Sequence, residues 1–189
     1  IAFTAGEVSG IDADTGALDW TQPHPADFGV NVAMPVFGPD HLLFLSSAYN
    51  GGARVLRLTR AGGGVRAEEV WSHKRVRIHF GNAVRLGDRV YASSGDSAVS
   101  PFAAVDVKTG DMAWRDRSVA RASLVGVGDR LLILDEDGKL TLATPGAEGL
   151  TVHGEVQLFS GRAWTAPAIL GTRLFARDRR EIVALELGR

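Results

Sequence analysis

Residues 104–114 read AVDVKTGDMAW and residues 10–20 read GIDADTGALDW, so one pattern occurs twice in the chain. In both copies an apolar run leads to an Asp, a Thr-Gly pair and, four residues after the Gly, a Trp. An Asp side chain can bond to the backbone of its own turn, and Gly adopts positive φ without strain. The pattern therefore predicts two strands joined by a tight hairpin, with the Trp at a fixed distance from the turn.

A second motif, two apolar strands joined by a turn containing Gly, occurs four times. The four segments are residues 35–44, 83–91, 124–132 and 167–175. Their starts lie 48, 41 and 43 residues apart, a period typical of a four-stranded propeller blade. No stretch keeps a helical period over a dozen residues. We therefore predict an all-β fold, a β-propeller arc of about four to five four-stranded antiparallel blades. A complete small β-sandwich is the alternative.

The repeats divide residues 1–189 into a single propeller portion with 18 expected strands. The blade units are residues 1–20, 32–71, 80–114, 121–159 and 164–187. The first unit lacks its innermost strand and the last stops after its third, so we expect the arc to be part of a larger ring. Exposed sheet edges would otherwise promote aggregation. The chain begins at Ile1 without a Met or a signal peptide, which favours a fragment or a processed product.

Composition excludes several classes of protein. The chain has 21 Lys and Arg against 22 Asp and Glu, whereas nucleic-acid-binding domains are usually strongly basic. With no Cys, disulfide frameworks, thiol catalysis and Cys-based zinc sites are ruled out. No apolar run approaches the roughly 20 residues of a membrane-spanning helix. We therefore expect neither a nucleic-acid partner nor a transmembrane segment within this chain.

Three tryptophans occupy corresponding places at the ends of the repeats. Trp20 and Trp114 close the two copies of the pattern, Trp71 closes a degenerate third copy, and the fourth unit has lost its Trp. A large ring at a fixed position on the last strand is suited to packing between blades, where the indole N–H can find an acceptor. We expect all three to be mostly buried and to dock neighbouring blades.

The pattern A-x-D-x-x-T-G-x-x-x-W, carried by residues 10–20 and 104–114, resembles the repeat of PQQ-like (quinoprotein alcohol dehydrogenase-like) β-propellers. The resemblance covers essentially the whole chain and implies the C-terminal portion of a bacterial repeat protein. That superfamily includes quinone-dependent dehydrogenases, the outer-membrane assembly scaffold BamB, and secreted or periplasmic proteins without assigned chemistry. It implies a non-catalytic scaffold or binding module in the periplasm or another extracytoplasmic compartment. Two alternatives stay open: a fragment of a quinone (PQQ)-dependent dehydrogenase, and an extracytoplasmic sensor domain.

The sequence gives little support to catalysis. Quinone dehydrogenases hold PQQ with a Ca²⁺ ion, a catalytic Asp and often a vicinal Cys pair, but this chain has no Cys. The acidic residues of the turns are explained as hairpin residues; they are Asp12, Asp14, Asp106, Asp135 and Asp137. None of the five His forms an i, i+4 pair. We therefore assign no catalytic residue and no metal ligand, and expect PQQ and Ca²⁺ only under the dehydrogenase alternative.

The loops that join the last strand of one blade to the first of the next open on one face of a propeller. They are residues 21–32, 72–80, 115–121 and 160–164, and we call this side the funnel face. The repeat alignment places aromatic and basic side chains around its mouth, and the ligand-binding candidates are Asn31, Arg77, His79, Arg121 and Trp164, with Phe80 beside them. Such groups suit an anionic or sugar-like ligand or a protein partner. The alternative is a solvated loop face with Trp164 packed between blades.

Overall fold

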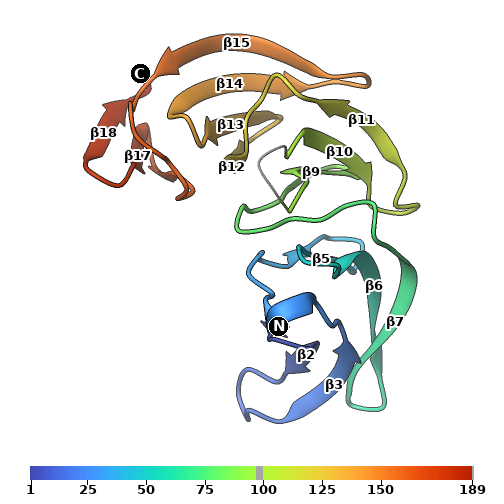
Figure 1. Ribbon diagram of the computed structural model, residues 1–189. Coiled ribbons are helices and arrows are strands. Elements are labelled where there is room, and N and C mark those ends of the chain that lie inside the picture. The colour runs from blue at the N-terminus through green and yellow to red at the C-terminus, as the bar shows by residue number, and fades with distance from the viewer. Residues whose placement is uncertain (97–99, 189) are drawn as a thin grey trace.

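The computed structural model describes residues 1–96 and 100–188 and consists of five antiparallel sheets fanned into an open arc (Figure 1). The two three-stranded sheets are blade 1, with β1 (Ala2–Phe3), β2 (Glu7–Ile11) and β3 (Leu18–Pro23), and blade 5, with β16 (Ala168–Leu170), β17 (Arg173–Arg177) and β18 (Ile182–Glu186). Blade 2 has β4 (Val36–Phe37), β5 (Leu42–Ser47), β6 (Gly52–Ala61) and β7 (Gly64–His73). Blade 3 has β8 (Val84–Leu86), β9 (Arg89–Ser93), β10 (Phe102–Asp106) and β11 (Met112–Asp116), and blade 4 has β12 (Ala122–Val127), β13 (Arg130–Asp135), β14 (Lys139–Pro145) and β15 (Leu150–Gln157).

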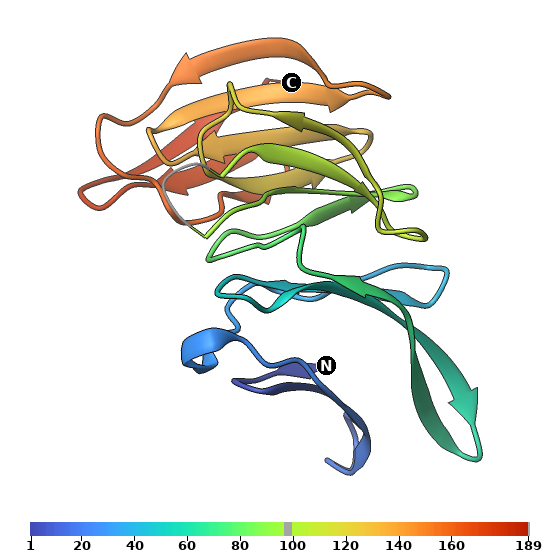
Figure 2. The same ribbon diagram turned by 45° about the vertical axis from the view of Figure 1, so that its right-hand side comes forward.

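The architecture confirms the predicted propeller arc and excludes the β-sandwich. The described residues form 18 strands, and each sheet is a meander in which consecutive strands pair. Their one helical element is the 3-10 turn η1 (Asp27–Gly29). Among the described residues, no helix has the length and apolar character needed to cross a membrane. The β6–β7 hairpin is longer than its counterparts and extends alongside β3 (Figure 2).

The predicted Asp-Thr-Gly hairpins form as the sequence indicates. The Asp106 carboxylate accepts hydrogen bonds from the backbone N–H groups of Lys108, at 2.8 Å, and Thr109, at 3.0 Å. Asp12 accepts the corresponding bond from the Thr15 N–H at 2.7 Å. Gly110 has φ 77°, in the region that favours glycine. These bonds close the turn locally, which is why the motif can be recognised from sequence.

The tryptophans lie at one register position on the outermost strand of blades 1, 2 and 3. Their Cα partners on the preceding strand are Gly10 for Trp20, Val55 for Trp71 and Ala104 for Trp114. In every case the ladder is irregular immediately after that pair. Trp20 and Trp114 are buried at 9% exposure, and Trp71 is half-buried. The expectation of equivalent, mostly covered rings is therefore met, with Trp71 the least covered.

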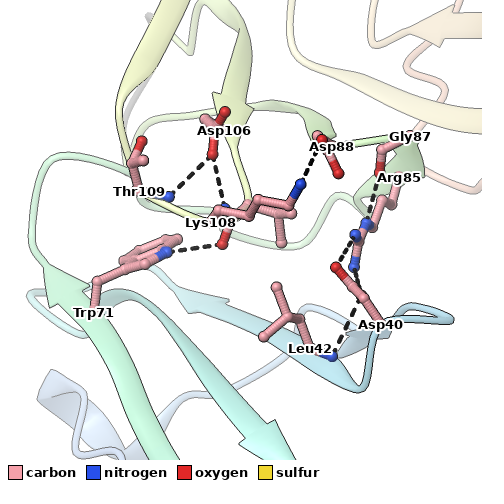
Figure 3. A network of polar contacts seen from close by, with 10 residues as sticks. Asp40, Leu42, Trp71, Arg85, Gly87, Asp88, Asp106, Lys108 and Thr109 are labelled. Carbon is pink, nitrogen blue, oxygen red and sulfur yellow. Dashed lines mark hydrogen bonds and ion pairs between the residues drawn. The ribbon is translucent and has the colours of Figure 1, made fainter.

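Trp71 shows how an indole joins two blades (Figure 3). Its Nε1 donates a hydrogen bond of 2.8 Å to the carbonyl of Val107, in the β10–β11 turn of blade 3. The imidazole of His73 stacks on its ring, with the centroids 4.9 Å apart. Trp114 repeats the contact one blade further on, where its Nε1 donates to the carbonyl of Gly146 at 3.1 Å. Each ring thus fills the outer part of an interface and also satisfies a backbone acceptor.

Apolar side chains alternate along the strands and bury both faces of a sheet. In β5, Leu43 and Leu45 belong to the cluster shared with blade 1, whereas Leu42 and Phe44 belong to the cluster shared with blade 3. Similar clusters lie between blades 3 and 4 and between blades 4 and 5. All of β5 is consequently buried, and the core is a series of layers between sheets.

A bidentate ion pair reinforces the interface between blades 2 and 3 (Figure 3). The Nη1 and Nη2 atoms of Arg85 donate to the two carboxylate oxygens of Asp40 at 2.8 and 2.7 Å. The Arg85 side chain is only 7% exposed, and its hydrogen bonds lower the pKa of Asp40 to about 2. The pair therefore stays ionised well below neutral pH and fixes the β4–β5 turn against β8.

We predict that Trp114→Ala lowers the free energy of unfolding by about 3–5 kcal/mol, because it removes a buried ring and leaves a cavity. Trp114→Phe should cost less, since a ring remains between Tyr91 and Phe102, both 6.0 Å from the indole by centroid. Urea titration followed by circular dichroism measures both values. A loss below 1 kcal/mol for the Ala variant would contradict the docking role.

We also predict that acid weakens the interface between blades 1 and 2 through His24. The side chain is 2% exposed, and burial together with the nearby charge of Arg54 lowers its pKa from 6.5 to about 4. The unfolded chain takes up this proton first, so stability is complete above pH 6.5 and falls by up to about 3 kcal/mol as the pH drops through 4. Unfolding titrations between pH 7 and 4 should show this loss in the native chain and a smaller one in His24→Gln.

Candidate functional site

Two sets of connections open on the funnel face. One set consists of the loops between blades, and the other of the turns between the second and third strands within a blade. The backbone N–H of Glu136, in the β13–β14 turn, donates to the carbonyl of Arg121, in the loop before β12, at 2.7 Å. The Asp27 N–H donates in the same way to the Tyr49 carbonyl, also at 2.7 Å. These backbone bonds place loop and turn residues side by side around the concave side of the arc.

Five rings from these segments form a continuous series that we call the aromatic array: Phe28, Tyr49, His79, Phe80 and Trp164. The successive centroid distances are 5.5, 4.8, 4.6 and 5.0 Å. Phe80 precedes blade 3 and Trp164 precedes blade 5, so their contact spans the inner end of blade 4. Trp164 remains 40% exposed, which leaves it open to a ligand as well as to its neighbours.

Two guanidinium groups lie on the rings of the array. The Cζ atom of Arg121 is 4.8 Å from the centroid of Phe80, and that of Arg179 is 4.4 Å from the centroid of Trp164. Arg121 also donates to the Ser100 hydroxyl, with its Nη2 3.1 Å from the oxygen. Stacking on a ring holds a guanidinium in place while its charge still acts on nearby groups.

A hollow of about 300 Å³ lies beside Trp164, and its lining residues are Arg162, Trp164, Thr165, Arg177, Asp178 and Arg179. Glu136 orients the two residues at its entrance: its Oε2 accepts from Trp164 Nε1 at 3.0 Å and from Arg162 Nη1 at 2.7 Å. Asp178 is occupied with the backbone N–H groups of its own turn. Three arginines line the hollow against Asp178, and Glu136 pairs with Arg162, so one positive charge remains in excess.

Backbone strain coincides with the first two rings of the array. Phe28 has φ 64° and Tyr49 has φ 50°, both in the left-handed region that bulky residues rarely adopt. The Tyr49 hydroxyl lies 2.7 Å from Nε2 of His79. Burial and the charge of Arg121 lower the pKa of His79 and so favour the neutral imidazole. Strained residues that persist in a fold often mark a functional site.

The structure brings together three of the five predicted ligand-binding candidates, His79, Arg121 and Trp164, and adds Phe80 between them. Asn31 lies apart from them: its Nδ2 donates to the carbonyls of Thr4, at 2.7 Å, and His24, at 3.0 Å. Asn31 thus fixes the entry into blade 2.

Arg77 is also separate from the array. It pairs with Asp96 at 2.7 Å, beside a second hollow of about 400 Å³ that Arg75, Arg115 and Arg117 also line. The basic residues expected on the funnel face are therefore present, but they divide between two places.

Sequence reasoning missed Tyr49, Glu136 and Arg179. All three belong to turns between second and third strands, which the repeat alignment treats simply as hairpins. Glu136 looked like a turn residue in the Asp-Glu-Asp-Gly run, and Asp135 does accept from the N–H groups of Asp137 and Lys139 as a hairpin residue would. Their position in the repeat could have identified them. In each blade the turn between the second and third strands lies on the same face as the inter-blade loops, and the two segments are joined by backbone hydrogen bonds in blades 2 and 4.

The acidic side chains of the repeated turns are engaged in local hydrogen bonds. Across residues 1–96 and 100–188, no three His, Asp or Glu side chains gather closely enough to hold a metal ion. Asp12 and Asp106, the most regularly placed carboxylates, are both committed to their own turns.

Comparison with known proteins agrees with the propeller architecture. No curated protein sequence matches the chain. Among solved structures, BamB from Moraxella catarrhalis matches with a TM-score of 0.53 and 15% identity over 95% of this chain and 66% of that one. The chain thus spans just under two thirds of that protein. The computationally designed Ika4 protein matches with a TM-score of 0.55 and 11% identity over 83% of this chain and 91% of that one.

The sequence itself identifies the family. A family model described as outer membrane protein assembly factor BamB matches residues 2–152, which takes in blades 1 to 3 and most of blade 4. These are the segments that contain both copies of the Asp-Thr-Gly hairpin and all three docking tryptophans. The chain belongs to this BamB-like family of PQQ-type β-propeller repeat proteins.

Proposed function

We propose that this chain is a non-catalytic scaffold and binding module that holds an anionic group of a ligand or partner protein against the aromatic array. The observation that carries the proposal is the continuous contact from Phe28 to Trp164, with Arg121 and Arg179 seated on its rings. Blade packing does not require these groups, since the core lies between the sheets. By family, we further propose a periplasmic or outer-membrane-associated location.

The chemistry of the site favours an acidic sugar or a similar planar anion over a simple ion. An exposed indole face can stack on the apolar face of a sugar ring, while neighbouring guanidinium groups pair with its carboxylates. Trp164 and Arg179 lie next to one another at the hollow. A site with few convergent polar groups around an aromatic surface is the usual form of a small-ligand pocket.

The positive potential at Trp164 has a spectroscopic consequence. We predict that the ratio of iodide to caesium quenching of tryptophan fluorescence exceeds the ratio for free N-acetyl-L-tryptophanamide, because Arg179 attracts the anion to the one Trp that is 40% exposed. Trp164→Phe should remove most of the iodide-quenchable emission, and Arg179→Gln should reduce iodide quenching. A ratio in the native chain no higher than that of free N-acetyl-L-tryptophanamide would contradict a positive site.

The binding proposal is tested by calorimetric titration with oligogalacturonate, an anionic sugar, and with an uncharged cello-oligosaccharide of equal length. We expect preference for the anion, a loss of at least tenfold in affinity for Trp164→Ala, and weaker binding at higher salt. Arg179→Ala should lose several-fold. The matched control is Arg173→Ala, which removes an exposed arginine from the opposite end of β17 and should leave binding unchanged.

Three outcomes would count against the proposal. Equal affinity for the two sugars would show that charge does not contribute to binding. Undiminished binding by Trp164→Ala would show that the aromatic array does not contribute. A similar loss in Arg173→Ala would mean that general surface charge is responsible. Circular dichroism of each variant confirms that the comparison is between folded chains.

A further inference from the structure

Blade 4 departs from the repeat at the position of the docking tryptophan. The Cα partner of Leu142 on β15 is Gly154, and the ladder is irregular immediately after this pair, as it is after the Trp pairs of blades 1 to 3. Gly154 therefore stands where the other outer strands carry an indole. Blade 4 keeps its outer strand β15 through this position, and only the indole side chain is absent.

An apolar groove of about 600 Å³ lies at this position, between blades 4 and 5. Its apolar lining includes Val127, Leu132, Leu142, Val156, Ile169 and Leu187. Gly154 forms part of its wall. The groove shares no lining residue with the hollow beside Trp164, so a molecule bound in the groove would not occupy the site of the proposed function.

The interface between blades 2 and 3 shows what a filled groove looks like (Figure 3). There Trp71 packs against the cluster that contains Val107, which is 0% exposed, and donates to the Val107 carbonyl. Leu187 corresponds to Val107: each follows the third strand of its blade, and each donates its N–H across the sheet, Val107 to the Asp88 carbonyl and Leu187 to that of Thr172. Leu187 is 48% exposed, and Gly154, at the indole position of blade 4, brings no ring to it.

The groove has room for an aromatic ring. A Cβ atom placed on Gly154 would meet nothing within 4 Å, and its backbone is outside the left-handed region. By contrast, a Cβ at Gly110 would come within 2.8 Å of the Trp71 ring. At the indole position of blade 4 the space for a side chain is therefore open.

We propose that this groove binds a tryptophan side chain presented by an extended segment of a partner protein. The apolar walls accept the ring, and the Leu187 carbonyl is the proposed acceptor for the indole N–H, because Leu187 corresponds to Val107, whose carbonyl accepts from Trp71. The chain's own interfaces are the template, since two of them hold an indole donating to a carbonyl of the next blade.

The test uses a peptide with the sequence of residues 110–116, GDMAWRD, which presents Trp114 in the native fold. In titrations of the ¹⁵N-labelled full chain, this peptide should shift the amide signals of Gly154, Ile169 and Leu187. The matched control peptide has Ala in place of Trp and should leave them unmoved. N-acetyl-L-tryptophanamide should cause the same shifts more weakly, because it lacks the extended backbone.

Gly154→Trp supplies the ring from the chain itself. We expect it to raise the melting temperature by several degrees and to weaken peptide binding at least tenfold, whereas Gly154→Ala should keep binding. Leu187→Asp changes a half-exposed side chain, so the fold should persist while the carboxylate disfavours the ring and weakens binding. If Gly154→Trp does not fold, this second variant decides the question.

Failure of the Trp peptide to shift these signals at millimolar concentration would overturn the proposal, as would equal shifts from the Ala peptide. Undiminished binding by both Gly154→Trp and Leu187→Asp would also overturn it, because the ring would then lie elsewhere. Shifts with N-acetyl-L-tryptophanamide alone would contradict the part that assigns an extended partner segment.

Discussion

A single sheet in this chain has two apolar faces, and it can bury them only against the sheets on either side. β5 obeys this constraint along its whole length, with Leu43 and Leu45 facing blade 1 while Leu42 and Phe44 face blade 3. The docking tryptophans extend the same contact to the outer strands, where an indole also satisfies a carbonyl of the next blade. Stability is thus a sum of nearest-neighbour interfaces, as in other repeat proteins.

The inter-blade loops contribute Val76, Ile78 and Ala163 to the core clusters, whereas the residues of the aromatic array belong to none of these clusters. The array residues can hold conformations that a packed strand could not, as the left-handed backbones of Phe28 and Tyr49 show. Strain of this kind costs of order 1–3 kcal/mol per residue, and here Tyr49 lies beside His79 while Phe28 lies beside Tyr49. The arrangement is better explained by a surface kept for contact than by a requirement of folding.

The strands, turns and tryptophan register could be predicted because their causes are local or periodic. Asp106 binds its own turn, and the Trp follows at a fixed spacing. The site could be predicted only in part. Repeat alignment finds loops that are equivalent, which located His79, Arg121 and Trp164. The alignment cannot show that the Asn31 side-chain amide donates its hydrogen bonds to two backbone carbonyls. The alignment also cannot identify Tyr49, Glu136 and Arg179. Their positions depend on tertiary contacts between the turns within blades and the loops between blades.

Departures from a repeat are informative when the surrounding interface stays intact. Between blades 4 and 5 the inner part of the contact is complete: Phe159 and Leu174 are at most 1% exposed in a shared cluster. Blade 5 therefore remains attached although Gly154 leaves the outer part open. In the outer part, Leu187 is half-exposed and a Cβ on Gly154 would meet nothing within 4 Å, and both residues line the same groove. The inner cluster holds blade 5 against blade 4. The outer groove is not needed for this contact, so it can receive a side chain from another molecule.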